Sequence, residues 1–202
     1  MSEAARLLRV PGSTLRLWFD VEGGRSLNFL ELLEGYTIQV LRTKHQLSMR
    51  RIRKAIGYLK RDTGEAYPLA MQGLGFEADR SDLYFTRFGK LISASEQGQL
   101  AIRQVLENFL QRVDHDASGL ALRFYPLTRD FRSDSPKAIV IDPALCFGRP
   151  CIAGRGIATS MVASRYKAGE SFTGLAEDYE CEVSVIEEAI RAELDLQQRA
   201  VA

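Results

Sequence analysis

The sequence has only three cysteines, two histidines and one tryptophan, and it contains no long apolar run. An odd number of cysteines without dense spacing argues against a disulfide framework, so we expect reduced, structural thiols. Neither histidine has a cysteine or carboxylate at metal-ligand spacing, and we therefore expect no metal and no other cofactor. No stretch reaches the ~18 apolar residues of a membrane helix, and the first residues lack the apolar core of a secretory signal. These absences predict a cytoplasmic protein that does not enter a membrane.

The net charge of +1 conceals an uneven distribution along the chain. Residues 1–61 contain 12 Lys or Arg and 5 Asp or Glu, whereas residues 62–202 contain 15 and 21. A positive N-terminal third is the electrostatic footprint of a phosphate-binding surface. The acidic remainder would be repelled by DNA and is better suited to protein partners.

The apolar pattern and the turn signals predict an α+β protein that is mainly α. We expect three domains, at residues 1–65, 66–132 and 133–202. The first should contain a short strand at 26–29 and four helices, over 2–9, 13–19 and 29–46 and after Ser48. We expect Ser13 to cap the second helix, and Ile52, Ile56 and Leu59 to form one apolar stripe on the fourth.

The other two domains mix short strands with helices. For the middle domain, a small α+β unit, the sequence predicts a hairpin over 83–94, a helix over 97–114 and a strand over 120–125. The C-terminal domain should open with a polar linker, over 129–137, and contain a strand over 139–141 and helices over 159–168, 173–179 and 184–197. The expected helix caps are Thr159, Ser171 or Phe172, and Ser184. Three helices of these lengths have the proportions of a helix-turn-helix.

The N-terminal motif Ala4-Ala5-Arg6-Leu7-Leu8, then Val10-Pro11, then Ser13-Thr14-Leu15-Arg16-Leu17-Trp18 resembles the opening of MerR-like winged helix-turn-helix domains. The resemblance covers about the first 60 residues and implies that residues 13–19 form a recognition helix, which would enter the DNA major groove. Arg9 stands where that family usually has a turn glycine, which costs free energy if φ is positive. Leu17 replaces an aromatic residue that often lies near the DNA backbone.

The DNA-contact candidates follow from this helix and from the basic residues near it. Leu15, Trp18 and Phe19 should face the core. The remaining candidates are Ser13, Thr14, Arg16, Leu17, Arg25, Arg50, Arg51, Arg53 and Lys54. Arg16 is suited to a bidentate guanine contact or to phosphate, and Ser13 to a phosphate oxygen. The cluster from Arg50 to Lys54 either touches flanking phosphates or is only a solvated helix face.

A second motif covers the C-terminal domain. Ile141-Asp142-Pro143, Gly148-Arg149-Pro150, Ile152, Gly154, Ile157 and Gly169 resemble domain of unknown function 433. Such domains often occur in antitoxins paired with PIN-type ribonuclease toxins, and their combination with a MerR-like domain is similar to the larger VapB-type antitoxins. The resemblance implies a repressor of its own operon that binds double-stranded operator DNA as a homodimer and neutralises a PIN-type toxin. Gly154-Arg155-Gly156-Ile157 stands where G-T-R-I is usual, so the arginine has moved by one position.

The last helix is acidic, which disfavours DNA contact there. Its apolar stripe of Val183, Ile186, Ile190 and Leu194 must be covered either by its own domain or by a partner, which could be a second copy or a toxin. We take Arg149, Arg155, Ile186 and Ile190 as the partner-binding candidates.

Two other functional classes remain open at this point. One is a stand-alone MerR-like regulator that responds to a small molecule, although no long dimerising helix follows the winged domain. The other is an enzyme with a nuclease site built from Asp142, Glu177 and Asp178. None of these acids lies in a catalytic motif, and Asp142 before Pro143 is typical of a turn cap. We therefore expect no catalytic activity.

Overall fold

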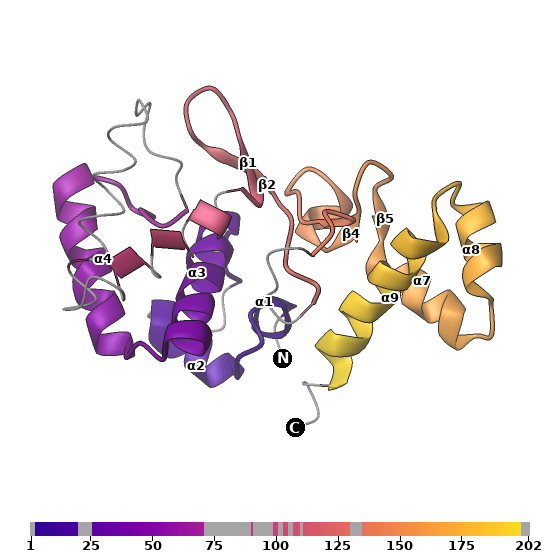
Figure 1. Cartoon of the computed structure of the whole chain (residues 1–202), viewed down its shortest axis with the longest axis horizontal. Helices are drawn as coiled ribbons and strands as arrows, with labels where there is room; N and C mark the ends of the chain where they lie inside the picture. Colours follow the sequence, from indigo (N-terminus) through magenta and orange to yellow (C-terminus); the bar gives the residue numbers. More distant parts are fainter. Residues whose placement is uncertain are drawn as a thin grey trace. The chain divides into compact units, whose positions relative to one another are not determined.

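The computed structural model describes residues 3–19, 26–70, 90, 99–100, 103–104, 107–109, 111–129 and 135–198 (Figure 1). The fold is α+β and mainly helical, as predicted, and its sheets are small and antiparallel. Contacts divide the chain into two compact units: Met1–Arg9 with Arg123–Ala202, and Val10–Leu122. These units do not coincide with the three expected domains, because helix α1 (Glu3–Leu7) packs against the C-terminal helix α9 (Val183–Gln198). Among the described helices, none is both long and apolar enough to cross a bilayer.

The Val10–Leu122 unit is built on α2 (Gly12–Phe19), α3 (Phe29–His45) and α4 (Met49–Thr63). The predicted apolar stripe of α4 is buried, and it joins α3 residues in one core. That core comprises Ile38, Leu41, Ile52, Ala55, Ile56, Leu59 and Leu69, with Trp18 and Phe19 packed against it. Ser48 caps α4, as predicted, by accepting a hydrogen bond from the Arg51 backbone N–H.

The expected strand at 26–29 is wrong for the residues described there. Asn28 is instead the N-cap of α3 and forms a capping box with Glu31, in which each side chain accepts from the other's backbone N–H at 2.8 and 2.9 Å. Such a box places the preceding backbone at a helix entrance rather than in a sheet. Arg25 lies outside the described residues.

The start of α2 also differs from the prediction. The helix begins at Gly12, and the carbonyl of Pro11 accepts from the backbone N–H groups of Thr14 and Leu15. Ser13 is therefore inside the first turn and is not the cap. Arg9 has a φ of 56°, in the left-handed region, at the cost expected for a non-glycine residue.

The middle of the chain contains one sheet of two described strands, β1 (Val113–His115) and β2 (Ala121–Phe124). β2 confirms the predicted strand. β1 shows that the predicted helix over 97–114 is too long, because Val113 already lies in a strand. The predicted hairpin over 83–94 lies outside the described residues except at Lys90, which is helical.

The unit of Met1–Arg9 and Arg123–Ala202, called the C-terminal unit below, adds a small sheet and the helices α7, α8 and α9 to α1. The antiparallel order is β3 (Ile139–Val140), β4 (Cys151–Ile152) and β5 (Ile157–Ala158), with Ile152 opposite Ile139 and Ile157. α7 (Thr159–Lys167), α8 (Phe172–Asp178) and α9 follow, close to their predicted bounds. The buried core comprises Ile139, Ile152, Val162, Leu175, Ala176, Ile186, Ala189 and Ile190.

Of the three expected caps, only Ser171 is confirmed; its side chain accepts from the Gly174 backbone N–H at 3.0 Å. Thr159 is the first residue of α7, and its buried hydroxyl donates to Glu193. Ser184 lies inside α9, where the carbonyl of Glu182 accepts the first helical hydrogen bonds.

The segment predicted as a polar linker is anchored at its described ends. Arg129 binds Glu188 of α9, and Ser135 is buried. A chain segment that pairs with a buried carboxylate belongs to the fold, so the linker prediction is wrong at these positions.

Candidate functional site

The charged side chains on the solvent side of α4 are all basic from Arg50 to Arg61. Its exposed cations are Arg50, Arg51, Arg53, Lys54, Lys60 and Arg61, while every apolar residue of the predicted stripe is buried. Helical spacing places Arg50, Lys54 and Arg61 along one line, and no acidic residue occurs between Met49 and Arg61. This face therefore presents one sign of charge over more than three helical turns.

Helix α2 contributes to the same unit. Leu15 is buried, as predicted, whereas Ser13, Arg16 and Leu17 are exposed and Thr14 is half-buried. The Arg53 guanidinium donates to the carbonyl of Leu17, which fastens α4 to the last turn of α2. A cation at this end also complements the helix dipole. We call Arg16, Arg50, Arg51, Arg53 and Lys54 the basic face.

Arginines of the C-terminal unit differ from those of the basic face because carboxylates neutralise them. Arg6 lies 3.2 Å from Glu193, and Arg123 lies 2.8 Å from Asp142. Within the described parts of the chain, no ion pair involves Arg16, Arg50, Arg51 or Lys54. Among the described residues, positive charge without a carboxylate partner thus lies along α4 and at Arg16 of α2, where it can attract a polyanion.

Two carboxylates of α9 that the sequence assigns to an acidic surface are buried. Glu193 binds Arg6 and Thr159, which docks α1 on α9. Glu188 accepts from both nitrogens of the Arg129 fork, at 2.9 to 3.3 Å, and from the Thr128 hydroxyl. Both carboxylates therefore hold distant segments of the chain together and contribute little to surface charge.

The pKa of Glu188 reflects this docking. Burial alone would raise the pKa, but hydrogen bonds from Arg129 and Thr128, with the charges of Arg129 and Arg191, outweigh it and lower the pKa below the usual range. The carboxylate stays ionised, so it can retain these partners.

The partner-binding candidates lie in two environments. Ile186 and Ile190 are buried in the core of their own unit, which removes both residues from the surface. Arg149 is largely exposed, with its Nε 3.5 Å from Glu3. Arg155 pairs with Glu180 at 3.6 Å and donates to the Glu180 carbonyl. Only the two arginines remain accessible to a partner.

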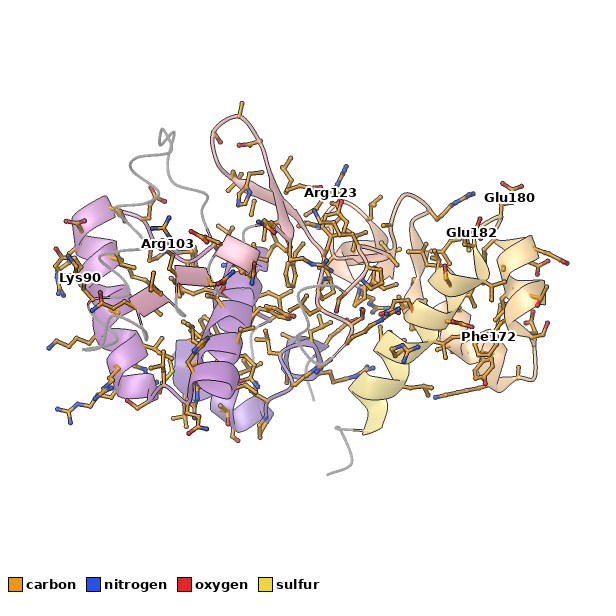
Figure 2. The ribbon with its side chains drawn as sticks, viewed as in Figure 1. Lys90, Arg103, Arg123, Phe172, Glu180 and Glu182 are labelled. Carbon is orange, nitrogen blue, oxygen red and sulfur yellow. The ribbon has the colours of Figure 1, made fainter. Side chains whose placement is uncertain are left out.

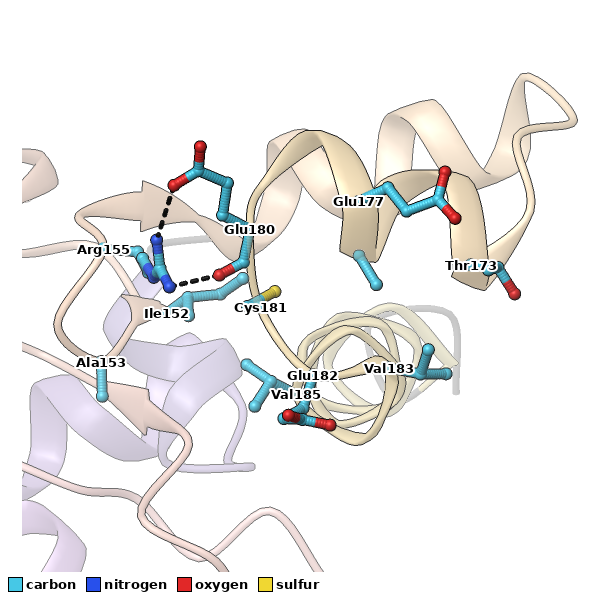
Figure 3. A pocket seen from close by; sticks show the side chains of 11 residues that line it. Ile152, Ala153, Arg155, Thr173, Glu177, Glu180, Cys181, Glu182, Val183 and Val185 are labelled. Carbon is cyan, nitrogen blue, oxygen red and sulfur yellow. Dashed lines mark hydrogen bonds and ion pairs between the residues drawn. The ribbon is translucent and has the colours of Figure 1, made fainter.

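A pocket of about 600 Å³ lies beside Arg155, between the turn after β4, helix α8 and the start of α9 (Figure 3). Its apolar lining comprises Ile152, Ala153, Ala176, Val183 and Val185. Its acidic lining comprises Glu177, Glu180 and Glu182, and the last two occupy the turn between α8 and α9 (Figure 2). Since Glu180 already pairs with Arg155, the pocket retains an excess of negative charge.

A strained turn precedes β4. Cys146, Phe147 and Gly148 have consecutive positive φ angles of 47°, 58° and 74°, and the two non-glycine residues each cost roughly 1–2 kcal/mol in this region. The turn leaves Phe147 98% exposed. Burial is the largest cause that raises the pKa of Cys151 to about 12, which fits the structural thiol that we expect there. Sequence reasoning did not single out Phe147.

The acids considered for an enzyme have structural contacts. Asp142 accepts from the backbone N–H of Ala144 at 2.8 Å, which confirms the predicted turn cap, and it pairs with Arg123. Asp178 pairs with Arg165, and Glu177 lines the pocket. Among the described residues, no group of three metal-ligating side chains is present.

Comparisons with known proteins place the chain near antitoxins. Residues 139–191 match the family described as "Protein of unknown function (DUF433)", which confirms the C-terminal resemblance. The chain is similar to "Putative antitoxin VapB45" of Mycobacterium tuberculosis, with 27% identity over 220 residues, 89% of this chain and 86% of that relative. Its fold is similar to the crystal structure of Rv2018 from Mycobacterium tuberculosis, with a TM-score of 0.70, 24% identity and coverage of 93% and 94% of the two chains. The family match and the relative together support an antitoxin-like protein.

Proposed function

We propose that this protein is the antitoxin of a type II toxin–antitoxin pair, which binds its operator DNA through the basic face and its toxin through the C-terminal unit. The observation that carries the proposal is the similarity to a protein named as an antitoxin over 89% of this chain. The match of residues 139–191 to DUF433 supports the same assignment.

The basic face supports DNA as the ligand of the Val10–Leu122 unit. An α-helix fits the major groove, and α2 presents Arg16 with the exposed Ser13 and Leu17. Arg16 is suited to a hydrogen-bonded contact with guanine, while the exposed Arg50, Arg51 and Lys54 are suited to contacts with DNA phosphates. In this proposal α2 is the recognition helix of a MerR-like domain, and the protein represses its own operon as a dimer.

We propose that the toxin is a PIN-type ribonuclease, because domains of the DUF433 type often occur in antitoxins paired with such enzymes. The exposed Arg149 and Arg155 are the side chains of the C-terminal unit that suit an acidic partner site. Each forms an exposed ion pair, which is worth about 0–1 kcal/mol and is easily exchanged for a new carboxylate.

The test is co-expression of the full chain with the product of the neighbouring gene, followed by a gel shift on the upstream promoter. We expect co-purification with a small nuclease and retardation of the promoter. Arg16→Ala should abolish specific retardation, and Arg191→Ala, a matched arginine change on α9, should retain it. Equal loss in both variants would contradict the placement of the DNA surface, and a neighbourhood without a nuclease gene would contradict the antitoxin role.

A further inference from the structure

Phe147 is an apolar side chain that its own unit leaves uncovered, with 98% of it exposed. The turn that carries it is held by backbone hydrogen bonds from Leu145 to Asp142, from Gly148 to Leu145 and from Arg149 to Cys146, at 3.0, 2.9 and 3.1 Å. The Cys146 thiol also donates to the carbonyl of Gly156 at 3.0 Å. A strained backbone with this many restraints fixes the direction in which the Phe147 side chain leaves the turn, and such strained turns are common at binding sites.

The pocket beside Arg155 is complementary to this ring. Its apolar lining suits an aromatic side chain, and its acidic lining suits a cation next to that side chain. Arg149 is two residues from Phe147, and its side chain is 61% exposed. The turn thus offers the two features, a ring and a cation, that the pocket can receive.

The ring and the pocket are neighbours on one unit. Cys146, next to Phe147, binds Gly156, which is next to the pocket residue Arg155. A two-fold interface requires one surface that is complementary to itself, and a protruding side chain beside a matching pocket meets that requirement. The same pair on distant faces would build an open chain of molecules.

We propose that two copies of this protein form a two-fold dimer in which Phe147 of each copy fills the pocket beside Arg155 of the other. Arg149 then approaches Glu177 and Glu182 of the second copy. This inference depends on neither DNA nor a toxin. The proposed dimer would also supply the interface that a protein needs to bind two operator half-sites.

Size-exclusion chromatography with light scattering tests the dimer directly on the full chain without a partner. The wild type should have twice the mass of one chain. Truncation of a central aromatic anchor should raise the dimer dissociation constant at least about 30-fold, so Phe147→Ala should elute as a monomer at the same concentration. Leu122→Ala, which shortens another exposed apolar side chain, should remain dimeric. A monomeric wild type or a dimeric Phe147→Ala would overturn the proposal.

Mixing two variants distinguishes loss of the contact between ring and pocket from loss of the fold. Ala153→Phe fills the pocket and should also give a monomer, although its Phe147 is intact. A mixture of Phe147→Ala with Ala153→Phe should form a heterodimer, because one intact ring then meets one intact pocket. The absence of that heterodimer would overturn the proposal. Phe147→Ala that stays dimeric but loses co-purification with a toxin would assign the ring to the toxin interface instead.

Discussion

Replacement of Glu34 by glutamine should stabilise the Val10–Leu122 unit at alkaline pH and leave its stability almost unchanged at acidic pH. Glu34 lies on α3 with only 3% of it exposed, and its Oε1 has no hydrogen-bond partner among the described residues. Burial raises its pKa to about 7, against smaller opposing contributions from the charge of Lys60 and a hydrogen bond from the Leu69 backbone. A buried carboxylate with an unpaired oxygen is costly when ionised.

The magnitude follows from the difference between folded and unfolded pKa values. A rise from 4.5 to about 7, at ~1.4 kcal/mol per pKa unit, corresponds to about 3 kcal/mol. Because the folded pKa is the higher one, the protonated carboxyl contributes fully below pH 4.5, and this contribution is lost as the pH rises through 7. Glutamine imitates the neutral form at every pH, so the gain from the substitution should grow as the pH rises above 4.5 and reach its full size above pH 7.

The assay is urea unfolding at pH 5 and pH 8, followed by the fluorescence of Trp18. This single tryptophan packs against the core of the same unit and thus reports on it. Comparison of variant with wild type cancels the pH response of His45 and His115, whose pKa values burial lowers. Glu65→Gln, with the same change of charge, is the control. An equal effect of Glu34→Gln at both pH values would refute the reasoning.

Two further predictions concern stability. Arg129→Ala should destabilise the C-terminal unit by about 2–3 kcal/mol, because it leaves the buried Glu188 without its main partner, whereas Arg155→Ala should cost less than about 1 kcal/mol. Since the folded pKa of Glu188 is lowered, the difference in thermal unfolding between wild type and Arg129→Ala should shrink as the pH falls through the usual glutamate range. A difference that stays constant with pH would contradict the role of this ion pair. Gln46→Gly should stabilise the Val10–Leu122 unit by about 1 kcal/mol in urea unfolding, because the exposed C-cap of α3 has a φ of 51°. A loss of stability would show that the Gln46 side chain matters more than its backbone.

Local features of the chain were predictable from the sequence. The stripe of Ile52, Ile56 and Leu59 and the cap at Ser48 depend on residues within one helix, and both are confirmed. The same holds for the strand near Phe124 and for the Asp142 turn cap. In contrast, β4 and β5 have two residues each, too few for alternation to be recognisable.

Long-range pairing was not predictable. Arg6 and Glu193 lie 187 residues apart, and nothing near either residue indicates that α1 docks on α9. Glu188 and Glu193 resemble surface acids in the sequence, although each is neutralised by a distant arginine. The exposed ring of Phe147 was missed for a related reason: only Gly148 marks a left-handed turn there, and the two preceding residues give no such signal.

The salt dependence of operator binding tests the central claim most directly. Each phosphate contact by a cation contributes roughly 0.9 to the slope of log affinity against log salt concentration. A variant with Arg50→Gln, Arg51→Gln and Lys54→Gln should therefore bind more weakly, with a slope smaller by roughly 2.7 in magnitude. The matched variant with Lys137→Gln, Lys167→Gln and Arg191→Gln, three exposed cations outside the basic face and the dimer interface, should keep the wild-type slope. An unchanged slope in the first variant, or an equal decrease in both, would contradict the assignment of DNA binding to the basic face.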